Sequence, residues 1–306
     1  PLIFHHEGLD ERIFEHLNIW TRKPNLRGWQ RIVNRIRNAK NSTTIAIVGK
    51  YTHLKDSYKS LHEALIHGGI ANDCKVNLVY VDSEDVEKQG PEALLKGMKG
   101  VLVPGGFGTR GIEGKIKAAR FAREKRIPYF GICLGMQIAV IEFAVNVVGL
   151  KGAYSTEFDR NTPHPVISLL TEWVDQNNQV QKRSADSDLG GTMRLGSCPC
   201  RLVPGTLAHQ AYNKRLIHER HRHRYEFNNN YREPLAEAGL VFSGICPDGD
   251  LVEIIEVPQD RHPWFLGCQF HPEFKSRPMD PHPLFREFVK ATLGNPGIRK
   301  GRKRRI

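Results

Sequence analysis

From Thr44 onward, short apolar segments alternate with amphipathic ones, and this order constrains the fold more than any other feature. Segments such as Ile45-Ala-Ile-Val-Gly49 are apolar without polar alternation, which is typical of parallel strands buried on both faces. The segments that follow them carry apolar residues at helical spacing. The alternation predicts an α/β fold with a mostly parallel central sheet flanked by helices. We expect strands at 45–49, 76–81, 100–103, 128–132 and 264–270, and helices at 58–68, 91–98, 115–125, 136–146 and 283–293.

Two parts of the chain depart from this alternation. Residues 1–43 contain two helix-like segments, 9–17 and 28–39, and no strand, so we interpret them as a linker or the edge of a missing part. After residue 151, strand-like segments at 166–170 and 192–196 are separated by a polar loop at 175–190, which predicts a smaller antiparallel portion in the second half. The predicted organisation is therefore 1–43, a main domain at 44–293, and a tail at 294–306.

The net charge of +12 is concentrated at one end of the chain. The tail Arg299–Arg305 supplies six positive charges, and a terminal basic run is most simply disordered and solvated. A contact between this tail and nucleic acid or another anion is the minority alternative. The apolar run Gln137–Val148 is too short to span a bilayer, and the first residues lack the pattern of an export signal. We expect a cytoplasmic protein that does not bind membranes.

Six cysteines are too few for a disulfide scaffold in a chain of this length, so the thiols are expected to be reduced. The pair Cys198-Pro-Cys200 is interpreted as two ordinary thiols in a turn, with a metal-binding knuckle as the alternative. No metal site is predicted.

A pentapeptide between an expected strand and an expected helix, Gly131-Ile-Cys133-Leu-Gly135, has the form of a nucleophile elbow with Cys in place of Ser. The turn is so tight that small residues must flank the nucleophile two positions to either side. It lifts the thiol above the sheet at the N-terminus of a helix, where unpaired N–H groups favour the nucleophilic thiolate. The alternative is a buried Cys in a glycine-flanked turn.

A nucleophilic Cys needs an imidazole to manage its proton, and Gln269-Phe-His271-Pro-Glu273-Phe offers one. In an extended segment, residues i and i+2 point to the same face, so His271 and Glu273 are expected to project together. His271 is the predicted base, and Glu273 the group that holds its tautomer. A surface turn is the alternative.

The loop Pro104-Gly-Gly-Phe-Gly108 ends another expected strand and contributes the third part of the predicted site. An attacked amide develops an oxyanion that needs N–H donors, for which we select the amides of Gly106 and Leu134. The alternative is a loop without a ligand. No phosphate-binding G-x-x-x-x-G-K-[ST] motif occurs in the chain.

These three motifs together resemble the class I glutamine amidotransferases with a Cys-His-Glu triad, a family with a flavodoxin-like fold. Three further strings resemble the glutaminase domain of CTP synthases in particular. They are Ser155-Thr-Glu-Phe, Gly190-Gly-Thr-Met-Arg-Leu-Gly and Glu219-Arg-His-Arg-His-Arg-Tyr-Glu. The resemblance runs from about residue 2 to about residue 292, and residues 1–18 resemble the end of that family's synthetase domain.

The resemblance implies roles for individual residues. Cys133 would be the nucleophile and His271 and Glu273 would complete the triad. Glutamine is a zwitterion, and it would find an anion in Glu157 and a guanidinium in Arg224. The implied glutamine-binding set is Gly106, Leu134, Gly135, Met136, Gln137, Glu157 and Arg224, and an implied GTP effector contact is Arg110 and Glu113. For His221 and His223, a solvated strand and a functional role both remain open.

The implied function is hydrolysis of L-glutamine to release ammonia for the amination of UTP to CTP, in pyrimidine nucleotide biosynthesis. The glutaminase part would need no cofactor, whereas the whole protein would use ATP and Mg²⁺, with GTP as activator, as a homotetramer. Without the ATP- and UTP-binding synthetase domain, this chain is not expected to make CTP. The alternatives are a stand-alone γ-glutamyl hydrolase of the same fold and a catalytically idle regulatory or assembly module.

Overall fold

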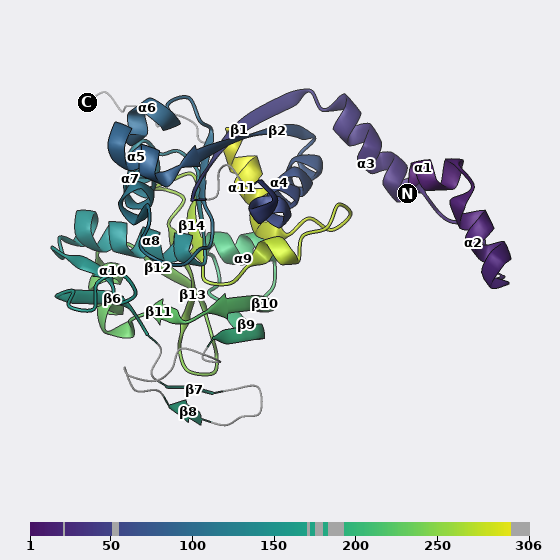
Figure 1. Cartoon of the computed structure of the whole chain (residues 1–306). Helices are drawn as coiled ribbons and strands as arrows, with labels where there is room; N and C mark the ends of the chain where they lie inside the picture. Colours follow the sequence, from purple (N-terminus) through teal and green to yellow (C-terminus); the bar gives the residue numbers. More distant parts are fainter. Residues whose placement is uncertain (21, 51–54, 170–171, 175–179, 183–192, 295–306) are drawn as a thin grey trace, which may run out of the picture.

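The computed structural model describes residues 1–306 except 21, 51–54, 170–171, 175–179, 183–192 and 295–306. Its centre is a nine-stranded sheet with the strand order β10-β9-β12-β13-β14-β4-β3-β1-β2 (Figure 1). The strands are β1 (Asn41–Gly49), β2 (Cys74–Asp82), β3 (Gly100–Val103), β4 (Tyr129–Ile132), β9 (Arg194–Leu202), β10 (Leu216–His223), β12 (Val241–Ile245), β13 (Val252–Val257) and β14 (Phe265–Cys268).

The sheet is mixed. Strands β2, β1, β3, β4 and β14 are neighbours and run parallel, whereas β13, β12, β9 and β10 continue the sheet in antiparallel pairs. The predicted α/β fold is thereby confirmed. The antiparallel strands of the second half extend the central sheet itself, so they form a continuous part of it. Tertiary pairing of this kind is not visible in the local pattern of a sequence.

Helices cover both faces of the sheet. One face carries α5 (Ser83–Gln89), α6 (Pro91–Leu95), α7 (Ile112–Glu124) and α8 (Leu134–Phe143), and the other carries α4 (Lys59–Ala71), α9 (Leu207–Tyr212) and α11 (Pro283–Thr292). In β1, Ala46 and Val48 pack into one apolar core while Ile45 and Ile47 pack into the other. This two-sided burial explains why the strand is apolar without alternation.

Short elements complete the domain. A small sheet pairs β11 (Tyr225–Phe227) with β6 (His164–Leu169) and β6 with β5 (Ala153–Ser155). A separate two-stranded sheet pairs β7 (Glu172–Val174) with β8 (Val180–Lys182). The other short elements are the 3₁₀-helices η1 (Lys55–Tyr58), η3 (Asn229–Tyr231) and η4 (Pro272–Phe274), the π-helix η2 (Ala144–Val148) and α10 (Arg232–Glu237).

The first forty residues form an arm whose first part extends away from the domain (Figure 1). Its helices are α1 (Leu2–His6), α2 (Leu9–Leu17) and α3 (Arg27–Asn38). Helix α3 touches the domain, because Ile32 is buried and Arg35 pairs with Asp73 at 3.2 Å. In α1 and α2, which the structure describes in full, no residue is buried.

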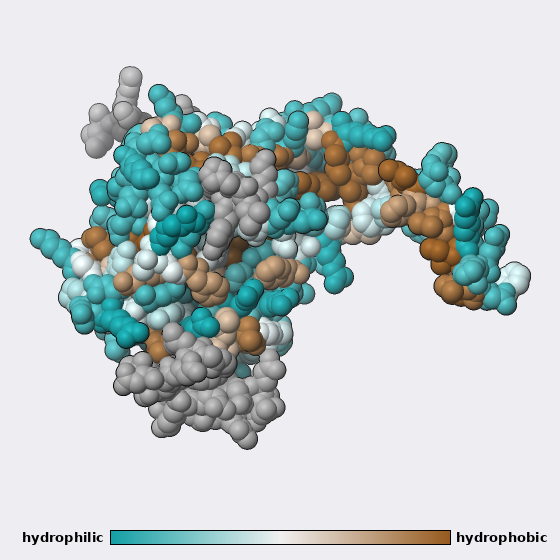
Figure 2. All heavy atoms as spheres, in the orientation of Figure 1, coloured by the Kyte–Doolittle hydropathy of each residue, from teal (hydrophilic) through white to brown (hydrophobic). Residues whose placement is uncertain are grey.

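Large apolar side chains are exposed along this arm, and Figure 2 shows them as a hydrophobic surface facing solvent. Trp20 is 95% exposed. An exposed apolar surface of this kind marks a contact with another protein part. The exposed residues are Ile3, Phe4, Leu9, Ile13, Leu17, Ile19, Trp20 and Ile36.

Several local expectations were wrong or lie outside the described residues. Strand β1 begins at Asn41, four residues before the expected start at Ile45, and β9 contains Cys198 and Cys200, which were expected in a turn. The predicted loop at 175–190 is described only at 180–182, and the tail is described only at residue 294. Among the described residues, no helix is both long enough and apolar enough to cross a membrane.

Helix α8 packs very closely on the sheet, which requires glycine at its second residue. A Cβ atom on Gly135 would overlap the carbonyl oxygen of Val103 in β3. We expect Gly135→Ala to lower the free energy of unfolding by about 3 kcal/mol, measured by urea denaturation. Gly28→Ala in α3 is the control, because its Cβ would meet only the flexible end of Met279, and it should leave stability within about 1 kcal/mol of the parent chain. Equal stabilities for the two variants would contradict this account of the packing.

Candidate active site

Cys133 lies in a sharp turn between β4 and α8. Its backbone angles are φ 51° and ψ −105°, a region that a residue with a side chain seldom adopts. Hydrogen bonds hold the turn: Cys133 N–H donates to the carbonyl of Cys268 at 2.7 Å, and the Cys133 carbonyl accepts from Met136 N–H at 3.0 Å. The turn places the thiol at the N-terminus of α8, with only 3% of the residue exposed.

His271 and Glu273 lie just beyond β14, the strand next to β4 in the sheet. Nδ1 of His271 is 2.8 Å from Oε1 of Glu273, and both side chains are largely buried. The pair meets because Pro272–Phe274 form the 3₁₀-helix η4, whereas we had expected an extended segment. With Nδ1–H donated to the carboxylate, Nε2 is the ring nitrogen left to face the thiol.

The glycine loop after β3 brings these groups together. A Cβ atom built on Gly105 would lie 2.9 Å from Cε1 of His271 and 3.4 Å from Cβ of Cys133. The nucleophile, the imidazole and the loop therefore converge on one point. They reach it from β4, β14 and β3, adjacent strands that all end at the same edge of the sheet.

The electrostatics of the pair favour an imidazolium. Burial alone would lower the pKa of His271, but hydrogen bonds and charge interactions with Cys133 and Glu273 outweigh it and raise the pKa to about 10. The direction of this pKa shift favours the protonated ring. A cationic imidazole beside a cysteine is the arrangement that supports a thiolate nucleophile.

The two residues predicted to supply oxyanion donors are neighbours in space. The Cβ position of Gly106 is 3.5 Å from Cδ2 of Leu134. Leu134 is the first residue of α8, so its N–H has no carbonyl partner within the helix. The start of this helix follows Cys133 directly in the chain, and the glycine loop approaches Cys133 at Gly105.

The segment 134–137 can serve a ligand only through its backbone. Met136 is fully buried in the apolar core, and Gln137 is turned inward. Nε2 of Gln137 donates to the carbonyl of Tyr225 at 2.9 Å and to Oε1 of Gln269 at 3.1 Å. Gly135 accepts from the Tyr129 hydroxyl at 2.8 Å.

Glu157 contacts the glycine loop, and the charge of Arg224 acts on its carboxylate. Oε1 of Glu157 accepts from Gly108 N–H at 3.0 Å. Burial raises the pKa of Glu157, while the Gly108 N–H and the charges of Lys50 and Arg224 act in the opposite direction. Within the described structure, the buried Nε of Arg224 has no hydrogen-bond partner, so this guanidinium can take an anionic group.

Arg110 and Glu113, the predicted effector contact, are each hydrogen-bonded to a neighbouring residue. Nη2 of Arg110 donates to the carbonyl of Lys50 at 3.2 Å, while Oε1 of Glu113 accepts from the Tyr154 hydroxyl at 2.8 Å. These contacts do not test the effector role, which stays a prediction.

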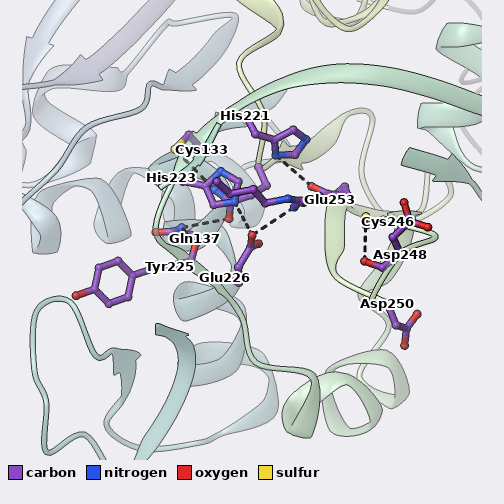
Figure 3. A network of polar contacts seen from close by, with 12 residues as sticks. Cys133, Gln137, His221, His223, Tyr225, Glu226, Cys246, Asp248, Asp250 and Glu253 are labelled. Atoms are coloured by element: carbon purple, nitrogen blue, oxygen red, sulfur yellow. Dashed lines mark hydrogen bonds and ion pairs between the residues drawn. The ribbon is translucent and has the colours of Figure 1, made fainter. Parts of the chain in front are cut away.

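Sequence reasoning missed a buried polar network beside the nucleophile, part of which Figure 3 shows. Nε2 of Gln269 donates to Sγ of Cys133 at 3.7 Å, linking the thiol to Gln137. Farther inside, Nη1 of Arg194 lies 2.7 Å from Glu253 and 3.3 Å from Glu226. The signal that was available is the presence of two carboxylates, Glu253 and Glu256, in the otherwise apolar strand β13.

His221 and His223, which were left open, belong to this network and are not solvated. Nε2 of His223 is 2.6 Å from Oε1 of Glu226. His221 is fully buried, and Nδ1 of His221 lies 3.6 Å from Oε2 of Glu253 (Figure 3). Burial, together with the charge of Arg194, lowers the pKa of His221 well below its ordinary value, so this ring is neutral.

Among the described side chains, no three of His, Cys, Asp or Glu are grouped so that they can hold a metal ion. Cys198 and Cys200 lie in β9, where burial raises the pKa of both thiols. The arrangement as a whole suits covalent attack by a thiolate on a carbonyl, with a proton donor and N–H groups at hand.

Comparisons with known proteins agree with this geometry. The family model described as "Glutamine amidotransferase class-I" matches residues 53–291. A solved structure titled as the glutaminase domain of Trypanosoma brucei CTPS with bound acivicin superposes with a TM-score of 0.72. It is 40% identical, and the match covers 82% of this chain and 93% of that one.

Curated relatives named "CTP synthase" are more similar still. The protein from Desulfotalea psychrophila is 60% identical over 296 residues, and the one from Nitratidesulfovibrio vulgaris is 57% identical over 297 residues. These matches cover 96% and 97% of this chain but 53% and 54% of the relatives. The chain therefore spans about half the length of the curated relatives that it matches.

The pKa of His271 depends on its partners, and Cys133→Ala removes one of them. Without the thiol, only Glu273 opposes the effect of burial on the imidazole. The pKa of His271 should therefore fall from about 10 toward the ordinary range for histidine. Titration of the ring by ¹⁵N–¹H NMR measures this value. Cys198→Ala, in β9, should leave it unchanged. An unaltered pKa in Cys133→Ala would contradict the proposed pairing of thiol and imidazole.

Proposed function

The chain belongs to the class-I glutamine amidotransferase family, and from this membership we propose that it hydrolyses glutamine as the glutaminase part of a CTP synthase. The observation that carries the proposal is the convergence of Cys133, His271 and the glycine loop at one point, with Glu273 behind the imidazole. Each group required for attack on an amide is present at the edge of one sheet.

Glutamine binding is proposed to use the two charges beside the loop. The α-ammonium group would lie against Glu157, and the α-carboxylate against Arg224, whose Nε has no partner in the described structure. The side-chain amide would then reach Cys133. Backbone groups of residues 134–137 would line the pocket, because their side chains are buried.

Catalysis is proposed to begin with attack of the Cys133 thiolate on the side-chain carbonyl carbon. The resulting oxyanion would be held by the N–H groups of Gly106 and Leu134. His271, which is cationic before attack, gives its proton to the nitrogen as the C–N bond breaks and ammonia leaves. A thioester between glutamate and Cys133 remains.

Hydrolysis of the thioester completes the cycle. The neutral His271 takes a proton from water, which attacks the thioester carbon. The second tetrahedral intermediate uses the same N–H donors, and its collapse releases glutamate and restores the thiolate–imidazolium pair. Glu273 keeps the Nδ1–H tautomer throughout, so that Nε2 always faces the reacting atoms.

The second half of the proposed function lies beyond this chain. The exposed apolar arm, residues 1–40, is proposed to belong with a synthetase domain, where ammonia would aminate a UTP phosphate intermediate. The chain covers 53% of a relative named "CTP synthase", which leaves room for such a domain. ATP and Mg²⁺ would act there, in a cytoplasmic homotetramer, and no described residue of this chain is assigned to hold them.

Activation by GTP is proposed at the level of the whole protein only. Arg110 and Glu113 remain the residues proposed to contact the effector there, and each is hydrogen-bonded to a neighbour in this structure. The exposed arm also favours the glutaminase half of a larger enzyme over a stand-alone hydrolase, because a self-sufficient domain has no need of this apolar surface.

Steady-state release of ammonia from glutamine tests the proposed activity. Cys133→Ala should abolish turnover, and Glu273→Gln should lower kcat about 10³-fold, because an amide no longer enforces the Nδ1–H tautomer. Glu92→Gln, on the surface of α6, is the matched control and should behave like the parent chain. Activity that survives in Cys133→Ala would rule out the assigned nucleophile.

Product analysis separates the two halves of the proposal. With glutamine, UTP, ATP and Mg²⁺, the chain should release glutamate and ammonia, and CTP should stay undetected by chromatography. This expectation follows from the match to CTP synthases, which covers only about half of the length of those proteins. CTP formed by the purified chain would overturn the assignment of synthesis to a missing domain.

A further inference from the structure

Lys50 was not predicted as a site residue, yet its ammonium group reaches the glycine loop. It follows β1 directly and is 9% exposed. Nζ donates to the carbonyl of Phe107 at 2.5 Å and to the carbonyl of Gly108 at 2.9 Å. Two consecutive carbonyls of the loop are thus turned toward one buried cation.

The same part of the loop is held from its other side. Gly108 N–H donates to Oε1 of Glu157 at 3.0 Å. The peptide unit between Phe107 and Gly108 therefore has its carbonyl bound to an ammonium and its N–H bound to a carboxylate. Charge-assisted hydrogen bonds at both ends fix the plane of this peptide more firmly than neutral ones would. Gly108 has φ +76°, so glycine is required for the turn itself.

Lys50 is itself anchored by its backbone. Its N–H donates to the hydroxyl of Tyr58 at 3.2 Å, and its carbonyl accepts from Nη2 of Arg110 at 3.2 Å. Both contacts join the end of β1 to neighbouring parts of the domain. The backbone of Lys50 is therefore held in place on both sides, which is what a positioning residue requires.

The peptide unit between Phe107 and Gly108 lies immediately after the residues that face the nucleophile. Gly105 lies against Cys133 and His271, and Gly106 lies against Leu134. Because peptide planes are rigid, turning the carbonyls of Phe107 and Gly108 toward Lys50 restricts the directions open to the preceding N–H groups. A displacement of about 1 Å in such donors can cost on the order of 100-fold in rate.

We propose that Lys50 is a positioning residue that orients the oxyanion-binding loop of the glutaminase site through the Phe107–Gly108 peptide. It does not touch the substrate. The inference rests on the proposed function and adds the group that holds the second oxyanion donor in place. It also gives Glu157 a second role, as the anion that accepts the N–H of the same Phe107–Gly108 peptide.

The test compares the parent chain with Lys50→Met and Lys50→Arg. Met keeps the length and packing of the side chain without donors, whereas Arg can still donate to two carbonyls. Three quantities are measured: kcat and KM for glutamine, the Ki of glutamate γ-semialdehyde, and the rate of Cys133 alkylation by iodoacetamide. The aldehyde forms a hemithioacetal with the thiol, so its affinity reports on the oxyanion donors.

For Lys50→Met we expect kcat to fall about 100-fold and the Ki of the aldehyde to rise by a similar factor. KM should stay within about fivefold, and the alkylation rate within about twofold, since neither needs the oxyanion donors. Lys50→Arg should retain kcat within about tenfold of the parent chain. Thermal melting shows whether each variant is folded.

Two results would overturn the inference. One is a folded Lys50→Met with kcat and aldehyde Ki within threefold of the parent values. The other is a loss shared equally by kcat, KM and alkylation rate in both variants, which would make Lys50 merely structural. A parent chain that neither hydrolyses glutamine nor binds the aldehyde would instead contradict the proposed function, and the inference with it.

Discussion

The backbone turn at Cys133 is the constraint on which the rest of the site depends. A positive φ at a residue with a side chain is costly, and it persists only where the surroundings hold it. Here β4 enters the turn, α8 leaves it, and the carbonyl of Cys268 in β14 accepts the Cys133 N–H. Glycine at 131 and 135 lets the strand, the helix and β3 approach closely enough to hold it.

The order of strands in the sheet brings the other groups of the site together. Strands β1, β3, β4 and β14 are consecutive neighbours and parallel, so their carboxyl ends share one edge. That edge receives Lys50, the glycine loop, Cys133 and His271 from segments far apart in the chain. Residues 41–50 and 265–273 thereby serve one site, and none of these groups needs a long loop to reach it.

Much of this could be predicted from the sequence, because the decisive signals are local. The elbow glycines, the apolar strands and the His271–Glu273 pair were recognised, although the pair meets through a 3₁₀ turn and an extended segment was expected. The buried network around Glu253 and the clamp at Lys50 were missed. The network depends on polar residues buried within a short strand, and the Lys50 contacts depend on a polar residue just past the end of one. Both arise from the pairing of strands far apart in the sequence, and hydrophobic periodicity does not reveal such pairing.

The most direct test of the central claim is intact-mass analysis after treatment with the chloroketone analogue of glutamine, in which a chloromethyl group replaces the amide nitrogen. The account predicts one adduct on the parent chain, blocked by excess glutamine and absent from Cys133→Ala. That result would show a reactive thiol and a formed glutamine pocket in the same molecule. An unmodified parent chain, or an adduct that persists in Cys133→Ala, would contradict the claim that this site binds glutamine and attacks it through Cys133.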